Sequence, residues 1–269
     1  LEETQRVKRY GFTAEELKRT KAKTLASYEK AYNERNKQNT KNYMREYANH
    51  FLELEPVPGI EWEYPTAKRM LEKEISLEML NNTVQRYIQP ANLIVDIMAP
   101  EKKGVELPAR EEVLAKLQAS YTASVSPYKE KALKKDLMHP PRKTGKIVKE
   151  TVNSVFGTTE WQLNNGIRVI LKPTVFKDDQ ILLSAFSEGG LSLVPNQKLV
   201  SGTYAVGVLQ NNGWGSFSTT ELDKILAGKI AGVSPHIGAY SEGFSGSSSV
   251  KDFETMLQLL CLKFTAVRK

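Results

Sequence analysis

The sequence predicts an α+β protein made of two incomplete α/β-sandwich domains, each an antiparallel sheet with helices on one face, joined by a basic linker. Apolar residues at helical spacing dominate the N-terminal part. The C-terminal part alternates between strand and helix patterns in the order β-β-β-α-α-β-β-α. Prolines, glycines and lysines concentrate between the two. The predicted boundaries are residues 1–125, 126–158 and 159–269.

A long helical segment is predicted at the N-terminus. Thr13 and Glu16 fit a capping box, in which each side chain accepts a hydrogen bond from the backbone N–H of the other residue. Apolar residues then recur at helical spacing through about residue 50. Pro56, Pro58 and Gly59 end the segment.

The rest of the N-terminal part is predicted to contain two helices, a strand and a third helix. The helices cover residues 65–73 and 76–87 and begin again at Pro108, and the β-branched run 92–98 predicts a strand. A single strand cannot form a stable sheet. We therefore expect this block to close an α+β domain whose other strands lie before Leu1.

The C-terminal part opens with a clear β-hairpin signal. Alternating apolar residues flank Asn164-Asn165-Gly166, and Asn-Gly supplies the positive φ angles of a tight hairpin turn. The elements expected after it are a strand at 180–187, a helix at 199–210, a short helix opened by a second capping box at Ser218 and Glu221, strands at 229–240 and 242–249, and a helix from Asp252.

Charge is concentrated in one segment. The chain has a net charge of +7, and residues 129–149 hold eight basic and two acidic side chains, a net +6. This predicts a solvated basic linker, with a docking strip for an acidic partner as the alternative. A nucleic-acid binder would spread basic residues over a folded face with aromatic residues between them, so no nucleic-acid partner is expected. No apolar run approaches the roughly 18 residues of a membrane span.

Residues with catalytic or metal-binding chemistry are few and scattered. His50, His139 and His236 have no second His or Cys at metal-binding spacing, and only His50 has acidic neighbours, Glu46 and Glu53. Cys261 lies in an apolar run typical of a buried thiol. The Gly-rich stretch 243–249 lacks the lysine of a phosphate-binding loop, and no Gly-x-Ser-x-Gly occurs. We therefore expect no metal site and no nucleophilic serine.

The hairpin Trp161-Gln-Leu-Asn-Asn-Gly-Ile-Arg-Val-Ile-Leu171 resembles the opening of a domain of the pitrilysin/insulinase (inverzincin) zinc peptidases, and the order of elements after it matches that family. The family has two homologous halves of two α+β domains each, and the first half carries the inverted zinc motif H-x-x-E-H. The resemblance implies that residues 1–125 end the second domain, 126–158 link the halves, and 159–269 begin the non-catalytic third domain. Since Leu1 is not a methionine and Lys269 follows an apolar run directly, we expect a chain cut from a longer protein.

The resemblance also places the zinc motif on Tyr204, Gly207 and Val208, where the family's active half has histidine, glutamate and histidine. Glycine and valine offer no lone pair to a metal, and a tyrosine phenol is a rare zinc ligand. Residues 199–210 contain no His, Asp, Glu or Cys, so a shift in the alignment restores nothing. The implication is that this chain has no catalytic residue, no bound cofactor and no metal, with zinc in the N-terminal half of the parent.

The function implied is that of a non-catalytic middle segment of a zinc metalloendopeptidase, a scaffold and a wall of the substrate chamber. Gly189-Gly190 and the 240–249 segment are the candidate walls. The expected partners are the parent's peptide substrate and the rest of the same chain. The alternative is a structural core-subunit-like scaffold protein without peptidase activity, with a nucleic-acid binder a distant third. The compartment stays open and is compatible with a secreted or periplasmic parent.

Overall fold

The structure is a computed structural model that describes residues 2–89, 94–131, 136–138 and 144–268. It contains two compact units, each considered by itself. One unit consists of Leu1–Ala22 and Thr66–Ala132, and the other of Lys23–Pro65 and Leu133–Lys269. The fold is α+β, as the sequence predicts.

The first unit is helical in its described part. Its helices are α1 (Glu2–Tyr10), the start of α2 (Ala14–Asn33), the end of α4 (Ile60–Arg69), a π-helical turn (Met70–Glu74), α5 (Leu77–Tyr87) and α6 (Arg110–Thr122). The predicted capping box opens α2, because the backbone N–H of Thr13 donates to Glu16 Oε2 at 2.8 Å and that of Glu16 to Thr13 Oγ1 at 3.3 Å. Ser76 caps α5 as expected, accepting from the N–H of Met79 at 3.0 Å.

The turn between α1 and α2 is fastened by one asparagine. The Asn81 side chain on α5 accepts from the N–H of Phe12 at 2.8 Å and donates to the Phe12 carbonyl at 3.3 Å. Gly11 has φ +70°, and a Cβ there would stand 2.5 Å from the Asn81 side chain, so only glycine fits beside this pair of bonds. The Tyr10 hydroxyl donates to the Val125 carbonyl at 2.9 Å and ties α1 to the segment after α6.

The second unit holds every strand of the described residues. Its helices before the sheet are the rest of α2, the 3₁₀ turn Arg35–Lys37, α3 (Thr40–Glu53) and the start of α4. The remaining elements are β1 (Ile147–Asn153), β2 (Thr158–Leu163), β3 (Arg168–Leu171), β4 (Ile181–Glu188), the 3₁₀ turns Gly190–Leu193 and Asn196–Lys198, α7 (Leu199–Asn212), α8 (Thr219–Ile225), β5 (Ala231–Ile237), β6 (Ser241–Ser248) and α9 (Phe253–Thr265).

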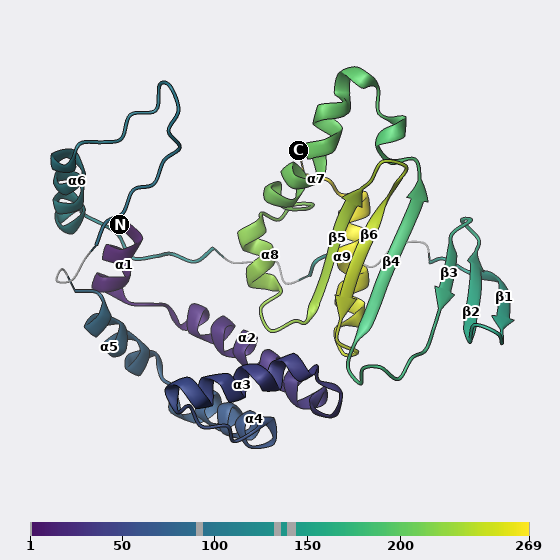
Figure 1. Ribbon diagram of the computed structural model, residues 1–269, viewed down its shortest axis with the longest axis horizontal. Helices are drawn as coiled ribbons and strands as arrows, with labels where there is room; N and C mark the ends of the chain where they lie inside the picture. The colour runs from purple at the N-terminus through teal and green to yellow at the C-terminus, as the bar shows by residue number, and fades with distance from the viewer. Residues whose placement is uncertain (1, 90–93, 132–135, 139–143, 269) are drawn as a thin grey trace. The chain divides into compact units, whose positions relative to one another are not determined.

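These strands form two antiparallel sheets of three strands, in the orders β1-β2-β3 and β4-β6-β5 (Figure 1). Helix α9 packs against β5 and β6, and α7 contacts β5. The buried core lies here, and its fully or nearly buried members include Trp214, Phe217, Leu222, Val233, Met256, Leu259 and Leu262. Burial of these side chains is the main force that holds α9 on the sheet.

Several predicted elements are confirmed and three differ. The second capping box, the hairpin, the helix at 199–210 and the last two strands form as expected. The predicted strand at 92–98 is wrong over Ile94–Met98, which has no regular structure because no strand is there to pair with it; residues 92 and 93 lie outside the described residues. Strand β1 is not predicted, because the whole of it lies within the segment 126–158 that the sequence analysis assigns to the linker; all its residues are exposed. The strands expected in one sheet lie in two.

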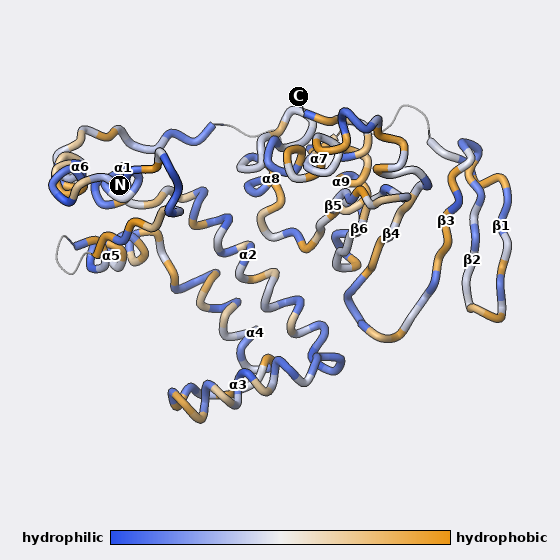
Figure 2. Tube along the Cα trace, turned by 45° about the horizontal axis from the view of Figure 1, so that its top comes forward, coloured by the Kyte–Doolittle hydropathy of each residue, from blue (hydrophilic) through white to orange (hydrophobic). Residues whose placement is uncertain are grey.

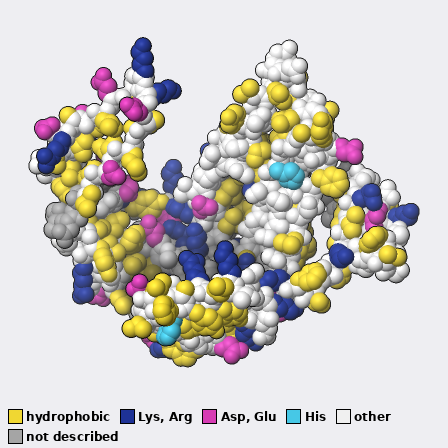
Figure 3. Space-filling model, in the orientation of Figure 1, with side chains coloured by type: hydrophobic (Ala, Val, Ile, Leu, Met, Phe, Trp, Pro, Cys, Tyr) yellow, Lys and Arg dark blue, Asp and Glu magenta, His cyan; other side chains and the backbone are white. Residues whose placement is uncertain are grey.

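Helix α3 carries large apolar side chains toward solvent. Met44, Tyr47 and Phe51 follow each other at helical spacing, and Leu52 and Leu54 extend the group. Figure 3 shows hydrophobic side chains gathered over this helix. These side chains do not contribute to the core around α9. Met44 on this helix and Met256 in the core are therefore a matched pair of residues for measuring the effect of core packing.

We expect Met256→Ala to lower the free energy of unfolding by about 2–5 kcal/mol, because the side chain is 0% exposed and its loss leaves a cavity between α9 and the sheet. Met44→Ala, on a side chain that is 68% exposed, should change it by about 0.5 kcal/mol or less. Urea denaturation followed by circular dichroism measures both. Equal losses in the two variants would contradict the position of the core.

Candidate functional site

The three positions that the resemblance aligns with the zinc motif lie on one exposed face of α7. Tyr204 is 69% exposed and Val208 57% exposed, and Gly207 between them is also exposed. Their i, i+3 and i+4 spacing puts them on the same side of the helix, as in a metal-binding pair. A Cβ on Gly207 would meet no atom within 4 Å. The face has the geometry of a two-histidine motif and only one side chain, a phenol, with a polar atom.

The histidines are not brought together in the described residues. His50 Nδ1 lies 2.7 Å from the Glu55 carbonyl oxygen, just beyond the end of α3, and His236 is exposed on β5. His139 lies outside the described residues. Across the described ranges, no three His, Cys, Asp or Glu side chains are placed to hold a metal ion.

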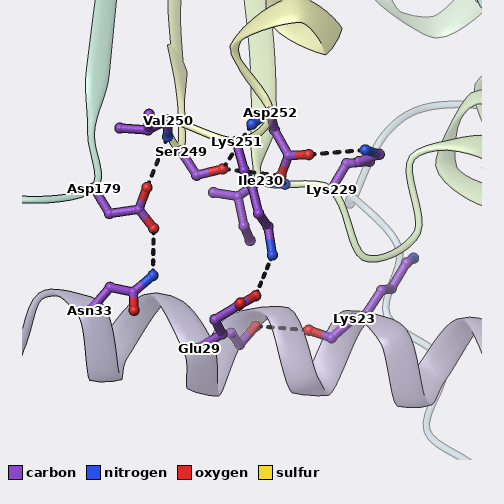
Figure 4. Close-up of polar contacts among 11 residues, drawn as sticks. Lys23, Glu29, Asn33, Asp179, Lys229, Ile230, Ser249, Val250, Lys251 and Asp252 are labelled. Carbon is purple, nitrogen blue, oxygen red and sulfur yellow. Dashed lines mark hydrogen bonds and ion pairs between the residues drawn. The ribbon is translucent and has the colours of Figure 1, made fainter.

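The best-organised polar cluster surrounds Asp252, the residue before α9 (Figure 4). Its side chain is 1% exposed and accepts three hydrogen bonds, from Ile230 N–H at 2.8 Å, Ser249 Oγ at 3.0 Å and Lys229 Nζ at 3.1 Å. The carboxylate therefore joins the start of β5, the end of β6 and the start of α9. A buried carboxylate with three donors is satisfied and holds a loop in place.

The charge of Asp252 is favoured in the folded protein. Burial by itself raises the pKa of Asp252, but the bonds from Ile230 N–H, Lys229 and Ser249 outweigh burial, so its pKa lies below the ordinary aspartate value. A carboxylate poised for general acid–base catalysis near neutral pH has its pKa raised instead. Asp252 is thus suited to hold structure and unsuited to move protons.

A second part of the cluster fastens α2 to the loops at one end of the sheet (Figure 4). Asp179 accepts from Asn33 Nδ2 at 2.9 Å and from the N–H of Val250 at 2.8 Å. The N–H of Asp179 donates to Glu34 Oε1 at 2.7 Å, and Lys251 pairs with Glu29. Hydrogen bonding to Glu29 raises the pKa of Lys251. The C-terminal half of α2 is held by polar contacts with segments far away in the sequence.

A half-buried lysine of α9 makes a further structural contact. Burial lowers the pKa of Lys263, whose Nζ donates to the Val233 carbonyl and lies 5.3 Å from the centre of the Trp214 ring. The contact joins α9 to β5 and to the segment after α7. A cation over an indole ring and bonded to a backbone carbonyl is a structural contact, which holds the helix against its neighbours.

Sequence reasoning did not single out Asp179 or Lys263, and it identified Asp252 only as the start of a helix. Ser249 and Asp252 carry a local signal, since a serine three residues before an aspartate at the start of a helix favours a side-chain-capped turn. Asp179 and Lys263 have partners distant in the sequence, so no local pattern identifies them.

The shared face of α7 can be tested with two histidines. Tyr204→His combined with Val208→His places two imidazoles one helical turn apart, so we expect the variant to bind one Zn²⁺ or Ni²⁺ measurable by isothermal titration calorimetry. Thr203→His with Val208→His is the control, because its two residues point about 140° apart around the helix. Equal binding by both variants, or by the unmodified chain, would contradict the geometry of α7.

We expect Asp252→Asn to lower the free energy of unfolding at neutral pH by about 1–3 kcal/mol, since buried donors lose a charged acceptor. Because the folded pKa of Asp252 is depressed, its stabilisation is present above the unfolded aspartate pKa of about 3.9 and is lost as pH falls through the folded value. Denaturation at several pH values should show a smaller acid-induced loss in the variant. Asp223→Asn, on the exposed surface of α8, should leave the acid-induced loss unchanged.

Comparison with known proteins supplies relatives for this chain. No family model matches it. It is 29% identical over 197 residues to a protein of Arabidopsis thaliana named zinc protease PQQL-like, a match that covers 73% of this chain and 20% of that protein. It is 28% identical over 127 residues to the probable zinc protease PqqL of Haemophilus influenzae, covering 47% of this chain and 14% of that one. The chain thus spans a fifth or less of these relatives.

A solved structure shares the fold over nearly the whole chain. A mutant of the ferredoxin protease FusC, solved in complex with Arabidopsis ferredoxin, matches 99% of this chain and 30% of its own with a TM-score of 0.51 and 17% identity. The periplasmic protease PqqL of Escherichia coli matches 99% of this chain and 29% of its own with a TM-score of 0.49 and 19% identity.

No helix in the described ranges combines the length and the apolar composition needed to cross a bilayer.

The resemblance seen in the sequence is confirmed by the relatives named zinc proteases, and the chain is a homologue of the pitrilysin-type zinc metallopeptidases that corresponds to part of such a protein.

Proposed function

We propose that this chain is the non-catalytic middle segment of a zinc metalloendopeptidase, where it serves as scaffold and as part of the wall of the substrate chamber. The observation that supports the proposal is the exposed face of α7 formed by Tyr204, Gly207 and Val208, the positions that the sequence resemblance aligns with the zinc ligands and the acid of the family's active half. The relatives are zinc proteases by name, and the chain spans 20% of the longer match.

The chemistry of the family motif supports this division of labour. An inverzincin site needs two imidazoles for zinc and a carboxylate to activate the bound water. Zinc bound in another part of the parent would lower the pKa of that water and polarise the peptide carbonyl. In this proposal residues 1–125 end the second domain, 126–158 link the halves and 159–269 begin the third domain. This chain then contributes rigidity and surface to peptide hydrolysis.

The walls proposed for the chamber are the turn at Gly189-Gly190 and the strand that follows Tyr240. The two are already joined, since the N–H of Gly189 donates to the Tyr240 carbonyl at 2.8 Å and the N–H of Gly190 to Glu242 Oε2 at 2.9 Å. Gly190 has φ +60°, and a Cβ there would lie 2.4 Å from the Gly238 carbonyl oxygen, so the turn requires glycine. The Tyr240 side chain is exposed and offers an aromatic surface to a peptide.

Metal analysis and a peptidase assay test the proposal together. We expect the purified chain to hold far less than one zinc per molecule by mass spectrometry and to leave a quenched fluorescent peptide uncut. The parent-length protein should hold zinc and cut the same peptide, and Tyr204→Ala with Val208→Ala in that protein should change neither.

Two results would contradict the proposal. Stoichiometric zinc or cleavage by the chain alone would place a catalytic centre within it. A parent-length protein without zinc and without activity would favour the non-enzymatic scaffold.

A further inference from the structure

The end of α2 is attached to the loops beside the β4-β6-β5 sheet through paired charges (Figure 4). Lys37 Nζ lies 2.5 Å from Asp178 Oδ1, and Lys251 Nζ pairs with the Glu29 carboxylate. Each of these side chains on the helix side meets one of opposite sign on the loop side. We call this contact the latch, and it is made by residues 29–37 on the helix side and by residues 177–179 and 250–251 on the loop side.

This part of α2 has different contacts on its different faces. Glu29 and Asn33 lie four residues apart and share the face that meets the loops. The Tyr32 ring lies on another face and packs on Tyr64 of α4, with 5.0 Å between the ring centres. Figure 2 shows α4 running alongside α2. Among the described residues, no member of α2 belongs to the buried core around α9, so the attachment to the loops depends on polar contacts.

Glu34 makes the attached state costly. Its side chain is 8% exposed, and its Oε1 accepts from the N–H of Asp179 at 2.7 Å. Its Oε2 has no hydrogen-bond donor within the described part of the chain and lies 3.5 Å from Lys177 Nζ. The desolvation of a buried charge can cost more than its ion pair returns. Because Glu34 would regain its hydration on release, the attachment is a small balance between attraction and desolvation.

The other two ion pairs of the latch are open to the ions of the solvent. The side chains of Lys37 and Asp178 are 30% and 47% exposed, and those of Lys251 and Glu29 are 52% and 34% exposed. Such pairs are screened by salt, since the Debye length falls from about 10 Å at 0.1 M to about 3 Å at 1 M. The core around α9 depends on apolar burial, which this screening does not weaken.

We propose that the latch is salt-sensitive: the end of α2 docks on the loops at low ionic strength and detaches at high ionic strength, while the sheet and the core around α9 stay folded. The structure then represents the docked state. Detachment is a property of this chain's own contacts. Its consequence rests on the proposed function, in which α2 belongs to the second domain and the loops to the third. Ionic strength would then set how firmly these two domains are joined.

Hydrogen exchange on the full chain, resolved to single amides by NMR, tests the latch. The reporter is the amide of Asp179, which is bonded to Glu34 in the docked state and loses this partner on release. Between about 20 mM and about 500 mM NaCl at constant pH, we expect it to exchange at least about threefold faster relative to an unstructured peptide. The amides of α9 should keep their rates, because the core stays folded.

Charge reversal is the second measurement, made at low salt. Lys37→Glu or Asp178→Lys alone places like charges together, so the Asp179 amide should exchange about threefold faster or more. The two changes combined restore an opposite pair and should return the rate to within about twofold of the unmodified chain. Lys116→Glu is the control, because it breaks the exposed ion pair with Glu112 on α6, and it should leave the rate unchanged.

An Asp179 amide whose exchange does not respond to salt would overturn the proposal. Equal acceleration of the α9 amides would do the same, because the whole unit would then unfold in place of the latch. So would a double variant as fast as the single variants, or a response to Lys116→Glu. Zinc content and peptidase activity do not enter this measurement, so the latch and the proposed function can fail separately.

Discussion

One buried carboxylate sets the geometry of the sheet unit. Asp252 is the last residue before α9, and its three donors come from the start of β5, the end of β6 and the lysine before β5. Without that anion the turn from β6 into α9 would leave buried donors unpaired, which is costlier than the loss of a surface bond. The helix that supplies the largest share of the core therefore starts at a position fixed by electrostatics.

The loop around Asp252 also holds helix α2 in place. Asp179 links Asn33 on α2 to Val250, two residues before Asp252, and Lys251 between them pairs with Glu29. Polar contacts of this kind fix the orientation of the helix without a large apolar interface, because each hydrogen bond requires a defined donor and acceptor geometry. The arrangement suits a scaffold, in which helices from one part of the sequence must be placed on a sheet from another.

Local chemistry explains what could be predicted from the sequence. Both capping boxes, the Asn165-Gly166 hairpin and the amphipathic spacing of α9 depend on neighbours within a few residues, and all form as expected. The failures have distant causes. Ile94–Met98 has strand-forming residues and no partner strand, and β1 follows directly on a basic, proline-containing segment that is typical of a linker. Asp179 acts through Asn33, Glu34 and Val250, which lie 71 to 146 positions away. Side-chain identity alone does not reveal such partners.

The surroundings of Gly207 on α7 leave room for a side chain. A side chain at that position would meet nothing within 4 Å, in contrast to Gly243, where a Cβ would collide with the Ala185 carbonyl oxygen. Packing thus excludes a Cβ at Gly243 and leaves room for one at Gly207. A glutamate at 207 and imidazoles at 204 and 208 would fit this helix without rearrangement of its neighbours. The space at position 207 is therefore no steric obstacle to a carboxylate on this face of α7.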